Sequence, residues 1–126
     1  MASASNINQI THVLTDRGTK YAVSGGAVRN RAEVDQFLKS LKKNKRFAKA
    51  THNTWAVVLS EGGPLKGDDG ESGAGMVIVN MLEHEQIVDH IIVVTRWYGG
   101  VKLGGDRFRR VKDSVAAYLE EFRAAI

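Results

Sequence analysis

Apolar positions recur at helical spacing along the segment that follows Asn30. Asn30 can cap a helix, and Glu33 stands three residues later, as in a capping box. Spacings of i, i+3, i+4 and i+7 then place four apolar residues on one helix face: Val34, Phe37, Leu38 and Leu41. The pattern therefore predicts a helix that ends in the lysine-rich run at 42–45.

The same spacing predicts two further helices. One begins after residue 71 and presents four apolar residues: Met76, Val79, Met81 and Leu82. The other runs from Asp106, a candidate N-cap, to about Phe122. Its apolar stripe consists of Phe108, Val111, Val115, Tyr118, Leu119 and Phe122. Each helix thus has one face that must pack against a core.

Short apolar runs between the helices predict strands. Segments 12–15 and 20–24 flank a turn at 16–18 and form a hairpin, and a third strand covers 55–59. Ile91–Val94 is apolar without alternation, which is typical of a strand buried on both faces. The order β-β-α-β-α-β-α predicts an α/β chain, specifically an α+β two-layer sandwich. We expect about four strands in a mixed sheet with helices on one face. We also expect a single domain over residues 10–126, preceded by a flexible tail over residues 1–9.

Composition narrows the function classes. The chain has 126 residues, of which 43% are hydrophobic and 25% charged, and it contains no cysteine. These values fit one globular domain, while the missing cysteines exclude disulfide scaffolds, thiolate metal sites and cysteine nucleophiles. The first residues have no basic segment followed by an apolar run, so a cytoplasmic protein is expected. No cofactor and no metal site are implied.

The charges are segregated along the chain. The formal net charge is +4, and two blocks contain six basic residues each. The first block is Lys39, Lys42, Lys43, Lys45, Arg46 and Lys49, and the second is Arg96, Lys102, Arg107, Arg109, Arg110 and Lys112. Such blocks fit a polyanionic partner, although each can also be a solvated helix face.

A glycine-rich loop joins the last strand to the last helix. It has four glycines within 99–105 and leads into a helix whose first turns carry Arg107, Arg109 and Arg110. Cations there oppose the helix dipole, which favours a bound anion. Aromatic residues between basic ones, as at Trp97 and Tyr98, can stack unpaired bases. The candidate anion or nucleic-acid site comprises Lys20, Arg46, Lys49, Arg96, Trp97, Tyr98, Gly99, Gly100, Lys102, Gly104, Gly105, Arg107, Arg109 and Arg110.

An alternative site uses His52 with Asp69 and Glu71. If the two segments meet, His52 and a carboxylate can form an acid–base pair opposite the glycine loop, in an enzyme or a small-anion binder. The simpler interpretation is that His52 hydrogen-bonds within the fold and that the polar loop at 68–71 forms a turn. Enzymatic activity is therefore left open, and a binding domain is the preferred hypothesis.

The glycine loop and several upstream motifs resemble the Impact/YigZ family. The signature from Arg96 to Gly104, Arg-Trp-Tyr-Gly-Gly-Val-Lys-Leu-Gly, ends a spaced pattern that begins at Gly75. Segments 50–53 and 68–71 also match, and 19–21 matches more loosely. The resemblance spans about 17–120, and the residues after Gly104 are closer to the eukaryotic Impact branch. The chain resembles the ancient domain alone, without the RWD domain of Impact or the ferredoxin-like domain of YigZ.

The resemblance implies a fold like the second domain of small-subunit ribosomal protein five. It also implies a role in translational regulation during amino-acid starvation, because Impact proteins bind the activator of the kinase that phosphorylates initiation factor two. Bacterial relatives are proposed to bind nucleic acid. RNA, a ribosome-associated protein or that activator is therefore the expected partner of the basic loop.

Overall fold

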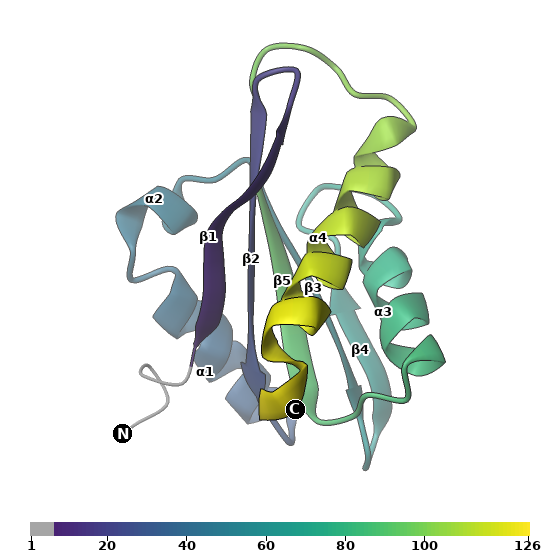
Figure 1. The fold of residues 1–126 in the computed structure, drawn as a ribbon. Helices are drawn as coiled ribbons and strands as arrows, with labels where there is room; N and C mark the ends of the chain where they lie inside the picture. Colours follow the sequence, from purple (N-terminus) through teal and green to yellow (C-terminus); the bar gives the residue numbers. More distant parts are fainter. Residues whose placement is uncertain (1–6) are drawn as a thin grey trace.

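Five strands form one sheet in the order β1-β2-β5-β3-β4 (Figure 1). The computed structural model describes residues 7–126. The strands are β1 (Asn8–Asp16), β2 (Thr19–Ala27), β3 (His52–Leu59), β4 (Gly63–Gly67) and β5 (His90–Trp97). Every pair of neighbouring strands is antiparallel. The last strand of the chain therefore lies at the centre of the sheet, where both its faces are covered.

The α+β class is confirmed, but two details of the expected sheet are wrong. There are five strands rather than four, and the sheet is antiparallel rather than mixed. The missed strand is β4, a short edge strand with glycine at both ends and Pro64, which an edge tolerates because it needs fewer ladder hydrogen bonds. Strand β1 begins at Asn8, inside the expected tail, while residues 1–6 lie outside the described residues.

Helices cover both faces of the sheet, which corrects the expectation of one covered face. Helices α1 (Arg31–Leu41) and α2 (Lys45–Ala48) pack on one face, and α3 (Ala74–His84) and α4 (Asp106–Phe122) pack on the other (Figure 1). A short 3-10 turn, Arg123–Ala125, follows α4. Alternate residues of β5 enter the two cores, since Ile92 and Val94 face α3 and α4 while Ile91 and Val93 face α1.

The predicted helices are present, with local corrections. Asn30 caps α1 as expected, accepting a hydrogen bond from the Glu33 main-chain N–H at 2.9 Å. The Glu33 carboxylate accepts from the Arg29 main-chain N–H instead of that of the cap, so the capping box is shifted by one residue. In α3, Ile78 is fully buried, whereas Met76 is 47% exposed and contributes nothing to the core.

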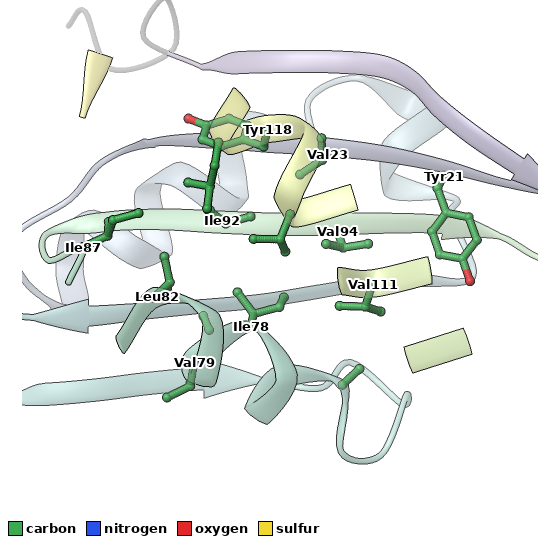
Figure 2. Packing of buried hydrophobic residues seen from close by; sticks show 14 of the residues in the cluster. Tyr21, Val23, Ile78, Val79, Leu82, Ile87, Ile92, Val94, Val111 and Tyr118 are labelled. Atoms are coloured by element: carbon green, nitrogen blue, oxygen red, sulfur yellow. The ribbon is translucent and has the colours of Figure 1, made fainter. Parts of the chain in front are cut away.

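The larger core lies between the sheet and the pair α3 and α4 (Figure 2). Tyr118 of α4 lies over β2 and β5, near Val23 and Ile92, and its hydroxyl hydrogen-bonds with Nε2 of buried His90 at 2.7 Å. Gly25 makes room for this ring, because a Cβ there would lie 2.4 Å from the Tyr118 hydroxyl. The core therefore contains one buried polar pair that joins α4 to the start of β5.

Burial of His90 makes stability depend on pH. Desolvation lowers the pKa of His90 to about 4, whereas the unfolded residue takes up its proton near 6.5. Between these values the unfolded state binds more protons, so we expect stability to fall by about 2 kcal/mol as pH falls from 7 to 4.5. Denaturant unfolding of the wild type and His90→Gln at both pH values checks this. If His90→Gln lost as much stability as the wild type between these pH values, the role of His90 would be contradicted. His84→Gln, which changes an exposed histidine, serves as the control.

Candidate functional site

The glycine loop, residues 98–105, closes the end of the sheet where β5 finishes (Figure 1). There it lies beside the turn between β1 and β2. The Gly99 N–H donates to the Thr19 Oγ1 at 3.1 Å, and a Cβ on Gly99 would lie 2.1 Å from the Gly18 carbonyl carbon. Glycine at 99 is therefore required by a close approach of two backbones.

The loop is held at both ends and exposed between them. The Tyr98 N–H donates to the Thr51 Oγ1 at 2.9 Å, and Leu103 is buried in the core under α4. Between these anchors, Gly100 takes a φ of 99°, which favours glycine, and Val101 and Lys102 are exposed. The loop thus presents a short, exposed tip on a fixed base.

The start of α4 differs from the expected anion site. The N-cap position is Gly105, and Asp106 is the first helical residue rather than the cap. The Asp106 carboxylate instead accepts a hydrogen bond from Arg17 at 2.7 Å. The N–H groups of residues 106–108 already donate to the carbonyls of residues 103–105. An anion at the first turn would therefore be bound by side chains rather than by main-chain N–H groups.

Two of the predicted anion-binding arginines are engaged within the fold. Arg96 is buried and its Nη1 donates to Oε2 of buried Glu71 at 2.7 Å. The Nε of Arg110 donates to Oδ2 of Asp16 at 3.0 Å, and Arg110 also pairs with Asp113. Hydrogen bonds from Arg17 and Arg110 lower the pKa of Asp16 despite its partial desolvation. These two arginines hold loops to the sheet and leave little charge for a ligand.

The remaining arginines of the second block are more accessible. Arg109 is exposed and lies 3.9 Å from an Asp106 oxygen, a weak surface pair. The Arg107 guanidinium lies 4.9 Å from the centre of the Phe108 ring, and its Nε is buried with no hydrogen-bond partner among the described residues. Arg107 forms no ion pair among the described residues, so its charge is not neutralised beside the loop.

The two aromatic residues after Arg96 have different roles. Trp97 packs edge-on against Phe47 of α2, and its indole N–H donates to the Arg46 carbonyl at 3.0 Å. The Arg46 guanidinium lies 4.2 Å from the centre of the indole ring system. Trp97 thus anchors α2, which leaves it unsuited to stacking a base, whereas Tyr98 is exposed. The contact also brings the two basic blocks together at one end of the sheet, from opposite faces.

Unpaired lysines surround this end. Lys20 of β2 lies opposite Trp97 in the sheet register, Lys49 is two residues from Thr51, and Lys102 is at the loop tip. All three are exposed, and none forms an ion pair within residues 7–126. We call the following set the basic end: Lys20, Arg46, Lys49, Lys102 and Arg107.

The alternative acid–base pair does not form. The Nδ1 of His52 is 2.8 Å from the main-chain oxygen of Asp69, not from its carboxylate. The Asp69 Oδ2 accepts from the Asn53 N–H at 2.6 Å, and Glu71 is the ion-pair partner of Arg96. The structure does bring His52 and the 68–71 loop together, as the hypothesis required, but their polar groups are used to fix that loop.

Asp68 has a role that sequence reasoning missed. Its carboxylate accepts from the main-chain N–H groups of Gly73 and Gly75 at 3.1 and 2.8 Å, and so caps α3. These hydrogen bonds, the one from Gly73 most strongly, lower the pKa of Asp68. Asp68 lies five residues before the N-cap position, Gly73, which is outside the usual capping spacing, so the sequence carries no simple signal for it.

Comparison with known proteins gives consistent matches. The profile of the Impact N-terminal domain matches residues 17–119. An IMPACT homolog from Caenorhabditis elegans is 34% identical over 116 residues, which is 86% of this chain and 45% of the relative. IMPACT from Danio rerio is also 34% identical, over 84% of this chain and 35% of the relative. This chain therefore spans less than half the length of these relatives.

Solved structures agree with the fold. The two-domain translational regulator Yih1 matches with a TM-score of 0.54 and 25% identity, over 88% of this chain and 46% of that one. A hypothetical protein matches with a TM-score of 0.77 over 92% of this chain and 58% of that one, and its 19% identity supports the fold alone. Within residues 7–126, no helix is long and apolar enough to cross a membrane.

Proposed function

This chain belongs to the Impact N-terminal domain family, and we propose that it is a non-enzymatic domain of translational regulation that binds RNA through its basic end. The description of Yih1 as a translational regulator supports a role in translational regulation. The unpaired lysines around the glycine loop support binding of RNA. The proposal places the domain in the cytoplasm, where translation takes place.

The observation that carries the proposal is the separation of charge between the two ends of the sheet. Acids at the loop end are used inside the fold, as Asp16, Asp68 and Glu71 show. Other acids lie at the opposite end, where α3 and α4 finish: Glu83, Glu85, Asp89, Glu120 and Glu121. Such a distribution orients the basic end toward a polyanion.

An acidic protein surface is the second candidate partner. Val101 and Tyr98 are exposed beside the lysines, and apolar groups among charges are also found at protein interfaces. The activator of the kinase that phosphorylates initiation factor two is the candidate that the family resemblance supplies. The engaged His52 and Asp69 give no support to the enzyme alternative.

Removal of three lysines tests the RNA-binding proposal. We expect Lys20→Ala/Lys49→Ala/Lys102→Ala to weaken binding to a labelled single-stranded RNA by about 10-fold or more at low salt. The slope of log K against log salt should shrink by about 2, because each lost phosphate contact removes about 0.7. Fluorescence anisotropy at several salt concentrations measures both quantities.

The matched control removes three charges from the other end of the sheet. Arg29→Ala/Arg31→Ala/Arg123→Ala lowers the net charge equally but leaves the basic end intact. Equal weakening by both triple variants would show a non-specific charge effect and refute the assignment of the site. No binding by the wild type at low salt would refute RNA as the partner and favour an acidic protein.

A further inference from the structure

Among the Phe, Trp and Tyr residues that the structure describes, only Tyr98 is exposed. This residue is 46% exposed, whereas the other eight are buried or half-buried. An isolated exposed apolar residue is common on protein surfaces and carries no information by itself. This one, however, lies inside the basic end, between the strand that carries Lys20 and the segment that carries Lys49.

The backbone around Tyr98 is fixed on both sides. Its own N–H donates to the Thr51 Oγ1 at 2.9 Å, and the N–H of the next residue, Gly99, donates to the Thr19 Oγ1 at 3.1 Å. The preceding Trp97 is tied to α2 through the Arg46 carbonyl. The buried Arg96 guanidinium lies 6.0 Å from the centre of the Tyr98 ring. Because the main chain at Tyr98 is already fixed, it loses little conformational entropy when the ring stacks on a ligand.

Three lysines lie within a few residues of the main-chain anchors of Tyr98. Lys49 precedes the Thr51 anchor by two residues, Lys20 follows the Thr19 anchor, and Lys102 extends from the loop tip. An exposed aromatic ring in a basic surface is the arrangement by which proteins bind single-stranded nucleic acid, since bases stack on the ring and phosphates pair with the lysines. A base inside a duplex has its faces covered and cannot stack on Tyr98.

We propose that Tyr98 is a stacking platform for an unpaired base, so that the basic end selects single-stranded RNA over duplex RNA. This inference rests on the proposed function and deepens it. Duplex RNA meets the lysines alone, and its binding is determined by charge. A single strand gains the stacking contact in addition.

The test compares Tyr98→Ala with Tyr98→Phe in the whole chain. We expect Tyr98→Ala to weaken anisotropy-measured binding of a 12-nucleotide single-stranded RNA by about 10-fold, and Tyr98→Phe by less than about 2-fold, because the ring alone stacks. The salt slope should stay unchanged in both variants, since neither removes a charge. Binding of a 12-base-pair duplex should change by less than about 2-fold. Val101→Ala, which shortens the neighbouring exposed side chain, is the matched control.

The outcomes separate this inference from the proposed function. If the lysine triple variant loses binding but Tyr98→Ala binds the single strand as tightly as the wild type, the stacking platform is refuted and the basic end stands. The same holds if the wild type binds duplex as tightly as single strand. If Val101→Ala weakens binding as much as Tyr98→Ala, a general apolar contact replaces stacking. If the wild type binds neither RNA, the proposed function itself fails.

Discussion

Glu71→Ala is expected to lower the free energy of unfolding by about 3–5 kcal/mol. The side chains of Arg96 and Glu71 are 9% and 2% exposed, and Nη1 and Oε2 are 2.7 Å apart. Without the carboxylate, a guanidinium remains buried and uncompensated, with its Nε already lacking a partner. The loss of stability arises more from the unpaired buried charge of Arg96 than from the loss of the contact itself.

Denaturant unfolding measures this effect against two comparison variants. Asp35→Ala breaks the Arg31–Asp35 pair, whose side chains are 62% and 61% exposed, and should cost less than about 1 kcal/mol. The double variant Arg96→Met/Glu71→Leu removes both charges and should recover much of the stability, because no unpaired charge stays buried. A cost for Glu71→Ala no larger than that for Asp35→Ala would contradict the burial of this pair.

Gly99→Ala is expected to cost about 2–3 kcal/mol and to displace the glycine loop. The new Cβ would lie 2.1 Å from the Gly18 carbonyl carbon and 2.5 Å from the Thr19 nitrogen. Both obstacles are main-chain atoms, which cannot move aside as a flexible side chain can. The turn between β1 and β2 and the loop must separate, and the hydrogen bond from Gly99 to Thr19 is then lost.

Gly105→Ala is the matched control for this substitution. It changes another glycine of the same loop, but a Cβ there meets no atom within 4 Å and φ is −65°. We expect a change below about 0.5 kcal/mol. Unfolding curves give the stabilities, and the RNA affinity of Gly99→Ala, measured under native conditions, reports whether the displaced loop still supports Tyr98. Equal stabilities of the two variants would contradict the close approach of the two backbones.

Much of the fold was predictable from local patterns. The stripes of Phe37 in α1 and Val115 in α4 follow helical spacing because each helix buries only one face. The run Ile91–Val94 correctly indicated a strand covered on both faces. That observation also implied helices on both sides of the sheet, an implication that the expected two-layer arrangement left out. Strand β4 was missed because a short edge strand with a proline carries almost no periodic signal.

The candidate site was predictable in its location but not in its chemistry. Sequence spacing identified the glycine loop, both basic blocks and the polar loop near Glu71, and the structure brings all of them to one end of the sheet. The structure also gives different surroundings to two aromatic residues that the sequence treated alike as base-stacking candidates. Trp97 is packed under Arg46, while the adjacent Tyr98 is exposed. Successive residues at a strand end face opposite sides, so neighbours in sequence have different surroundings.

The three longer helices, the central strand, the family and the total of basic residues could all be read from the sequence. Which charges remain available to a partner depends on the folded arrangement. Arg110 is neutralised by Asp16, 94 positions away, and Arg96 by Glu71, 25 positions away, while Lys20 has no ion-pair partner among the described residues. Hydrophobic periodicity is local and therefore readable along the chain. Charge pairing depends on distances of a few ångströms between distant segments, which exist only after the sheet and its loops have assembled.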